Sequence, residues 1–140
     1  MTLAPQIERA LGHWNAGNPD RHLELYSPRI QLHGYSPEPM NADAVHAFYR
    51  MVWDALSGPG RKSPRMEIGG MFETGSMLAF RGAMIGHMAG LFLGYPAKGK
   101  PYRIDVTTMM RFEDGKVAER WSCADMLALL VQSSAVTLPG

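Results

Sequence analysis

Residues 101–124, PYRIDVTTMMRFEDGKVAERWSCA, decide the fold of this chain. Polar and apolar side chains alternate through the stretch, and Asp114-Gly115 interrupts the alternation with a dipeptide that favours the tight turn of a β-hairpin. The stretch therefore predicts two antiparallel strands, over residues 101–113 and 116–124, joined by this turn.

The chain before this hairpin places helices first and strands second. Apolar residues recur at helical spacing in three segments, and three other segments have the composition and alternation of strands. The expected helices span residues 2–17, 19–26 and 42–56, and the expected strands span residues 30–34, 65–74 and 77–89. A last helix is expected after Asp125, which can cap it. This order, without β-α-β alternation, indicates an α+β fold.

Glycines at the end of the expected 77–89 strand indicate a strongly bent sheet. Gly82, Gly86 and Gly90 follow at intervals of four residues, and glycine in a strand commonly marks a bulge or sharp bend. A bent antiparallel sheet wrapped around the N-terminal helices leaves a conical cavity that is open at one end. We therefore expect a cystatin-like cone.

Methionines are abundant where the strands are expected. The chain has 11 of them, and most lie between positions 66 and 110. Flexible, polarizable thioethers suit a cavity wall that adapts to a large apolar ligand, and ordinary core packing is the alternative.

Length and composition are those of one globular domain, which we take to span residues 1–140. The 14 Lys and Arg against 13 Asp and Glu leave a net charge of +1, and no segment gathers the basic residues that nucleic-acid binding requires. Glu8 and Arg9 interrupt the apolar run that a signal peptide would need, and no run of about 18 apolar residues predicts a membrane span. The lone Cys123 cannot form an internal disulfide. We therefore expect a cytoplasmic protein without nucleic-acid or membrane partners.

Two motifs resemble the SnoaL-like polyketide cyclase family. HMAGLFLGYPAKGK, residues 87–100, is similar to the family segment GxHxGxFxGxPATGK. RFEDGKVAERW, residues 111–121, followed by Asp125 and by LLVQ at 129–132, is similar to the family ending RFxDGKIxExWxxxD and LLxQ. The resemblance is specific over residues 82–132.

The match departs from the family pattern at Lys98 in place of Thr, at Arg120 in place of a frequent His, and at Ser133-Ser134 in place of Leu-Gly. The resemblance implies the fold of nuclear transport factor 2, a homodimer or higher homo-oligomer, and no metal or organic cofactor. The family's characterised cyclases close a ring by intramolecular aldol condensation.

Asp125 is the first candidate catalytic residue. The resemblance places it where those cyclases have an acid/base Asp, and a period of two places it on the face of Trp121. A carboxylate beside a large aromatic ring in an apolar cavity has a raised proton affinity, which suits a base for carbon acids. An Asp directly before an apolar helix is also a preferred N-cap, and the two roles are compatible.

His87 is the second candidate catalytic residue, because it corresponds to a pocket His of the family. It would orient Asp125 or donate a hydrogen bond to a substrate carbonyl oxygen as the enolate forms. Strand parity groups it with Arg81, a predicted substrate contact, although a bulge would exchange the faces. A solvated or structural His is the alternative.

Five further side chains are predicted substrate contacts: Trp121, Tyr35, Phe48, Trp53 and Met109. Tyr35 is the preferred polar contact among them, and the aromatic residues on helices and the first strand have core filling as their alternative role.

The resulting hypothesis is an enzyme that abstracts a proton α to a carbonyl of a mostly apolar small molecule, as cyclisation, isomerisation and dehydration require. The first alternative is a binding module that holds an apolar ligand without chemistry. The second is a subunit whose open sheet face mediates dimerisation only.

Epoxide hydrolysis is the least favoured reaction. Arg103-Ile104-Asp105 is similar to the Arg-x-Asp of limonene-epoxide hydrolases, but here it follows the Pro-to-Lys turn, and Cys123 stands where a second acid is needed. The two charges alternate with apolar residues, so we expect an exposed pair on the outer sheet face. The remaining histidines lack the spacing of a metal site.

Overall fold

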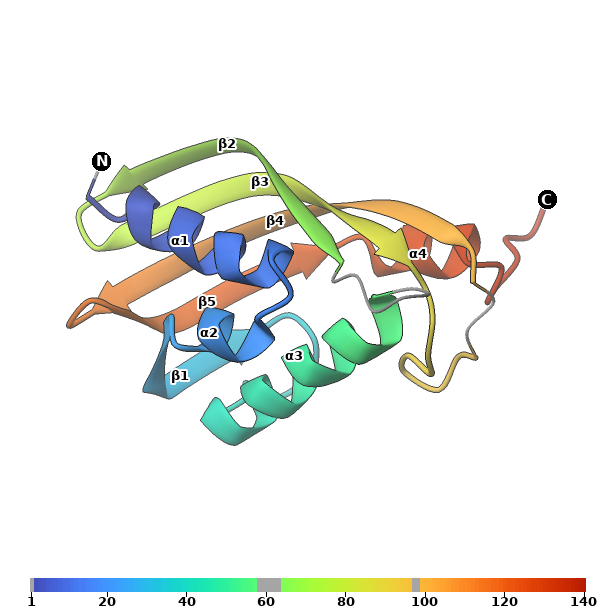
Figure 1. Ribbon diagram of the computed structural model, residues 1–140, viewed down its shortest axis with the longest axis horizontal. Coiled ribbons are helices and arrows are strands. Elements are labelled where there is room, and N and C mark those ends of the chain that lie inside the picture. The colour runs from blue at the N-terminus through green and yellow to red at the C-terminus, as the bar shows by residue number, and fades with distance from the viewer. Residues whose placement is uncertain (1, 58–63, 97–98) are drawn as a thin grey trace.

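The computed structural model describes residues 2–57, 64–96 and 99–140. The helices are α1 (Ala4–Asn15), α2 (Pro19–Leu23), α3 (Ala42–Leu56) and α4 (Met126–Gln132). The strands are β1 (Tyr26–His33), β2 (Arg65–Thr74), β3 (Met77–His87), β4 (Pro101–Glu113) and β5 (Lys116–Ala124) (Figure 1). The stop predicted after residue 56 and the turn predicted at 96–100 lie partly outside the described residues.

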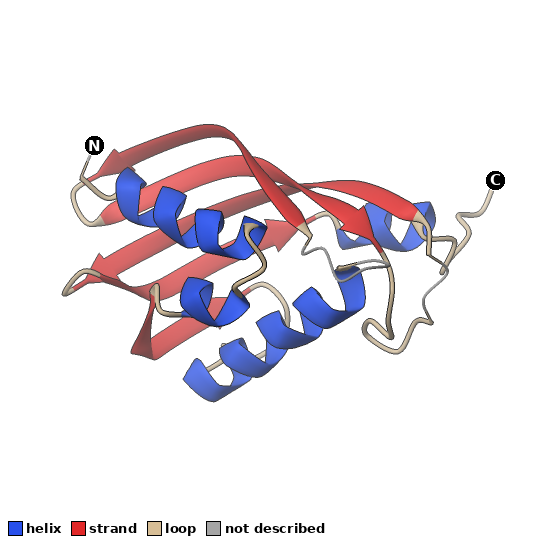
Figure 2. Cartoon of the chain, viewed as in Figure 1, coloured by secondary structure: helices blue, strands red, loops and turns tan. Residues whose placement is uncertain are grey.

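The five strands form one curved, open sheet with the order β1-β5-β4-β3-β2. Neighbours from β2 to β5 are antiparallel, while β1 joins the edge parallel to β5. Helices α1, α2 and α3 lie along one side of this sheet, and α4 packs against β4 near one end (Figure 2). The α+β cone expected from the sequence is confirmed, with one parallel pair that the sequence analysis did not include.

The hairpin between β4 and β5 has the predicted turn. Asp114 and Gly115 have φ angles of 51° and 77°, both in the left-handed region that this dipeptide tolerates best. Beyond the turn, Phe112 pairs with Val117 but Arg111 pairs with Glu119. Ala118 is therefore an extra residue in β5, and this bulge exchanges the faces of every later residue in the strand.

Close contact between strands explains one of the glycines that predicted the bend. A Cβ at Gly82 would stand 2.3 Å from the carbonyl oxygen of Glu67 on β2. Next to this point β2 has a register shift between Ile68 and Gly70. The backbones approach each other here because Gly82 has no side chain, and the bulge increases the local twist.

The inner face of the sheet carries the hydrophobic core. Along β4 the buried residues are Tyr102, Ile104, Val106, Thr108, Met110 and Phe112. Arg103 and Asp105 between them are exposed, as predicted, and Arg103 forms an ion pair of 3.3 Å with Glu67.

The cap predicted at Asp125 is present, and Asn41 caps α3 in the same way. Asn41 accepts a hydrogen bond from the Ala44 N–H, and Asp125 accepts one from the Ala128 N–H, each at 3.0 Å. Within the described residues, no helix is long and apolar enough to cross a membrane.

Candidate functional site

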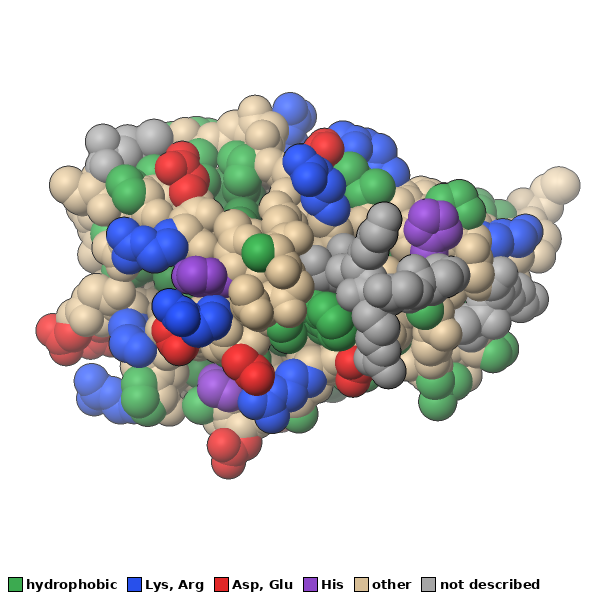
Figure 3. Space-filling view, in the orientation of Figure 1, with side chains coloured by type: hydrophobic (Ala, Val, Ile, Leu, Met, Phe, Trp, Pro, Cys, Tyr) green, Lys and Arg blue, Asp and Glu red, His purple; other side chains and the backbone are tan. Residues whose placement is uncertain are grey.

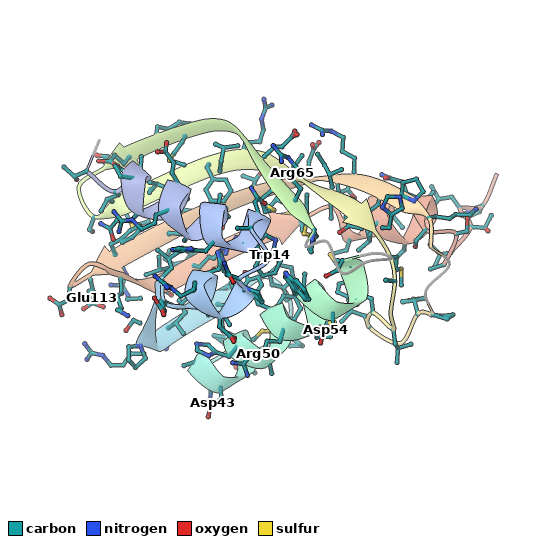
Figure 4. The ribbon with its side chains drawn as sticks, viewed as in Figure 1. Trp14, Asp43, Arg50, Asp54, Arg65 and Glu113 are labelled. Atoms are coloured by element: carbon teal, nitrogen blue, oxygen red, sulfur yellow. The ribbon has the colours of Figure 1, made fainter. Side chains whose placement is uncertain are left out.

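A cavity lies between the helices and the inner face of the sheet. It has a volume of about 590 Å³, counting the space at its open mouth. Trp14 points from α1 toward this interior (Figure 4). The lining residues are Leu11, Trp14, His22, Tyr35, Phe48, Tyr49, Val52, Leu56, Met66, Met84, Phe92, Val106, Arg120, Ala124 and Met126. A mostly apolar wall with a few polar groups is typical of a small-molecule site.

Arg120 brings a buried positive charge into this cavity. The bulge at Ala118 turns it to the inner face of β5, where it is only 6% exposed. Its Nε donates a hydrogen bond of 2.9 Å to Thr108 Oγ1, and its Nη1 donates one to the Tyr26 hydroxyl. Among the described residues no carboxylate pairs with it. Because arginine stays protonated in proteins, the cavity holds a cation whose direct partners are neutral hydroxyls.

Tyr49 lies against the same guanidinium. The Arg120 Cζ is 5.7 Å from the centre of the Tyr49 ring, which stacks on Tyr26 at 5.9 Å with an interplanar angle of 11°. The Tyr49 hydroxyl is near that of Tyr26 without reaching hydrogen-bonding geometry, and it is buried without a partner in the described chain. Burial raises the pKa of Tyr49 well above its ordinary value, so the phenol is neutral and can donate.

His22 on α2 is another buried polar side chain that lines the cavity. Its Nδ1 lies 3.0 Å from the Ala10 carbonyl oxygen, which can only accept, so Nδ1 carries the proton and Nε2 keeps its lone pair. Burial first, and then the charge of Arg120, lower the pKa of His22 to about 4, against the opposing effect of the Ala10 hydrogen bond. His22 is therefore a neutral imidazole at pH 7.

Aromatic edges hold His22 in place. Its ring meets Trp14 at 5.2 Å and Tyr49 at 6.1 Å between centroids, both edge to face. Such contacts fix the ring orientation that a hydrogen-bonding or proton-accepting imidazole needs.

Tyr35 adds a further polar group to the wall of the cavity. The Tyr35 hydroxyl and Ser122 Oγ are 2.9 Å apart, and the Tyr35 ring packs on Phe48 with centroids 4.6 Å apart. Ser122 follows Arg120 on the inner face of β5. Of the six predicted substrate contacts, Tyr35 and Phe48 line the cavity.

The other four predicted contacts lie elsewhere. Trp53 is half-buried on α3 but does not line the cavity. Arg81 is exposed in a depression of the outer sheet face, and Met109 is 42% exposed on that face opposite Trp121. Trp121 stacks on His33 at 5.5 Å. Strand alternation places Arg81 and Met109 on the outer face of β3 and β4. In β5 the Ala118 bulge places the odd-numbered residues after it, including Trp121, on that outer face as well.

The expectation that Asp125 lies inside an apolar cavity beside Trp121 is wrong. Asp125 is exposed, and its carboxylate caps α4. Its neighbours Ala124 and Met126 line the cavity, so the Asp125 side chain points away from it. Asp125 and Trp121 share a face as predicted, but it is the outer one.

The structure does not bring His87 to Asp125. His87 is exposed at the end of β3 and pairs with Pro101, whereas Ala124, beside Asp125, pairs with Val106. Five residues of β4 separate these positions, or roughly 17 Å at about 3.4 Å per residue. Asp125 and His87 therefore do not lie together, because β3 runs past the end of β5.

Sequence reasoning did not assign Arg120, His22 or Tyr49 to the cavity, although all three line it. Arg120 did carry a signal, since it departs from the family pattern and alternates with the small residues Ala118, Ser122 and Ala124. On the face that carries the helices, Figure 3 shows positive and negative side chains interspersed. The surface charge on this face therefore does not indicate where the cavity lies.

A bent, open sheet with helices on one side is the cone of a nuclear transport factor 2-like fold, and here the cone encloses an apolar cavity with a few polar groups. The sequence profile of the SnoaL-like polyketide cyclases matches residues 7–133, and the chain belongs to that family. Among curated protein sequences, none matches this chain.

Solved structures share the fold at low identity. AclR from Streptomyces galilaeus, provisionally assigned as a hydroxylase, superposes with a TM-score of 0.84 at 18% identity, covering 97% of this chain and 98% of AclR. TsrD from Streptomyces laurentii superposes with a TM-score of 0.80 at 21% identity, covering 96% of this chain and 97% of TsrD. A SnoaL-like polyketide cyclase from Agrobacterium tumefaciens superposes with a TM-score of 0.74 at 18% identity, covering 93% of this chain and 96% of the cyclase. At these identities the likeness concerns the fold alone.

Proposed function

We propose that this protein is an enzyme that moves a proton at a carbon next to a carbonyl group of a mostly apolar small molecule held in the cavity. One observation carries the proposal: Arg120 and the neutral imidazole of His22 line the same apolar cavity. A cation for the oxygen and a lone pair for the proton are what this reaction needs.

In the proposed step the substrate carbonyl oxygen accepts hydrogen bonds from the Arg120 guanidinium. The α carbon–hydrogen bond breaks, the proton passes to His22 Nε2, and the electron pair moves onto the oxygen to form an enolate. The donors are oriented before this charge develops, so they stabilise it without reorganisation. Ring closure, isomerisation and dehydration all start from such an enolate.

A non-catalytic binding protein is the second candidate. The observation that favours it is the pKa of about 4 for His22, because an imidazole of such low proton affinity is a weak base. Arg120 and the tyrosines would then fix the orientation of a bound ligand only.

Hydrogen exchange separates the two candidates. The protein is incubated in D₂O with 2-tetralone, an apolar ketone, and loss of the α-proton signal is followed by NMR. An enzyme is expected to accelerate exchange at least about tenfold over buffer, and Arg120→Met and His22→Gln are each expected to remove the acceleration. Asp125→Asn and His87→Gln are the matched controls and should exchange like the wild type. A wild-type rate equal to that of buffer would contradict the proposed enzyme.

A further inference from the structure

We infer that the buried end of the cavity is a subsite for a planar anion with two oxygens, either a carboxylate or the enolate of a 1,3-dicarbonyl compound, received by Arg120 and Tyr49. The inference rests on the proposed function for placing the substrate in the cavity. It concerns the charge and shape of the ligand, however, and binding alone can test it.

Charge balance is the first argument. Arg120 is 6% exposed, and the ion pairs of the described chain involve other, more exposed side chains. Its sequence neighbour Glu119 points to the outer face, where its carboxylate pairs with His33 at 2.7 Å and Arg111 at 3.4 Å. A buried charge without a counterion is costly, and a ligand anion offsets that cost.

The unused donors are the second argument. Arginine has five N–H donors, and within the described chain Arg120 uses two of them, on Thr108 and Tyr26. The remaining three belong to a planar fork that matches a pair of oxygens in one plane. Tyr49 adds a hydroxyl that is buried without a partner in the described residues, on a side chain only 8% exposed. Unpaired buried donors of this kind are rare unless a ligand or water pairs with them.

The surroundings define the rest of the ligand. Leu11, Val52, Leu56, Met66 and Met84 form apolar walls of the same cavity. A carboxylate or dicarbonyl head on an aromatic or aliphatic body fits both parts, because the head meets the donors and the body displaces water from the walls.

Two matched pairs of small molecules test the subsite by isothermal titration calorimetry on the full chain. The first pair is 2-naphthoate and its neutral isostere 2-naphthamide. The second is 1-phenylbutane-1,3-dione and 1-phenylbutan-1-one, which lacks the second oxygen. We expect wild type to bind one or both of the two-oxygen ligands at least about tenfold more tightly than the matched neutral ligand, which corresponds to about 1.4 kcal/mol. Which pair shows the preference distinguishes a carboxylate from an enolate.

Three variants locate the effect. Arg120→Met is expected to abolish the preference, and Tyr49→Phe, which removes one oxygen atom and keeps the fold even if Arg120→Met does not, is expected to reduce it about fivefold. Arg81→Met removes an exposed arginine on the outer face and should keep the full preference. Equal binding within both pairs, no binding of any ligand at millimolar concentration, or a preference unchanged in Tyr49→Phe and Arg120→Met would overturn the inference. An anion preference without α-proton exchange would leave the subsite standing and remove only the proposed reaction.

Discussion

The guanidinium of Arg120 lies 5.7 Å from the centre of the Tyr49 ring, inside the cavity, and the Tyr49 hydroxyl beside it has no partner in the described chain. Two buried groups that can donate hydrogen bonds thus lie together, and no acidic side chain of the described residues pairs with either of them. An unpaired buried charge of this kind contributes little to the stability of the fold, because replacing buried charges by apolar side chains is often neutral or stabilising.

Replacing Arg120 by Met is therefore expected to leave the free energy of unfolding within about 1 kcal/mol of wild type, although the side chain is buried. Urea denaturation measures this quantity, with Arg81→Met on the outer face as the control, expected within about 0.5 kcal/mol. A loss of more than about 3 kcal/mol in Arg120→Met would mean that the guanidinium serves the fold through Thr108 and Tyr26 rather than a ligand.

His22 makes stability depend on pH in a defined window. Its pKa is about 4 in the folded chain against 6.5 in the unfolded chain, so between these values the unfolded state binds more protons. The contribution of His22 to the free energy of unfolding is therefore fully present above about pH 6.5, and about 3 kcal/mol of it is lost as the pH drops through 4. Urea denaturation from pH 4 to 8 measures the slope. His22→Gln should flatten it and His13→Gln should not, whereas equal slopes in both variants would show that other groups cause the acid loss.

Asp125 tests the residue assignment directly. Because its carboxylate caps α4 on the outside, Asp125→Asn should retain the cap, and Asp125→Ala should lower the free energy of unfolding by about 1 kcal/mol. Neither variant should change α-proton exchange measured on the folded protein. If Asp125→Asn lost exchange by orders of magnitude at unchanged stability, the base would be Asp125 and the family resemblance would be the better guide.

Gly82 and Gly70 form a matched pair on neighbouring strands. A Cβ at Gly82 would stand 2.3 Å from the Glu67 carbonyl oxygen, whereas one at Gly70 would meet nothing within 4 Å. We expect Gly82→Ala to lower the free energy of unfolding by about 2–4 kcal/mol and so to lower the melting temperature strongly. The free energy of unfolding of Gly70→Ala should stay within about 1 kcal/mol of wild type. Similar melting temperatures for the two variants would show that the strands can separate locally at little cost.

Local sequence was sufficient for most of the fold. The Asp114-Gly115 turn and the Asn41 and Asp125 caps depend on neighbours within a few residues, and all three are present in the structure. The strand boundaries of the C-terminal half also agree closely with the predicted ones, because a period of two is visible in the residues themselves.

The site depended on contacts that the local pattern does not contain. His22, Tyr49 and Arg120 come from α2, α3 and β5, and packing of the helices on the sheet is what gathers them around one cavity. Which face of β5 looks inward was decided by a single extra residue, Ala118. A one-residue shift exchanges the faces of a strand, so it placed Arg120 inside and left Trp121 and Asp125 outside. The sequence by itself thus determined the order of the elements and the family of the fold, although β1 begins at Tyr26 rather than at residue 30 and α2 ends at Leu23 rather than at residue 26. The tertiary structure alone decided which side chains face the cavity, because a bulge depends on pairing with β4 and not on neighbours along the chain.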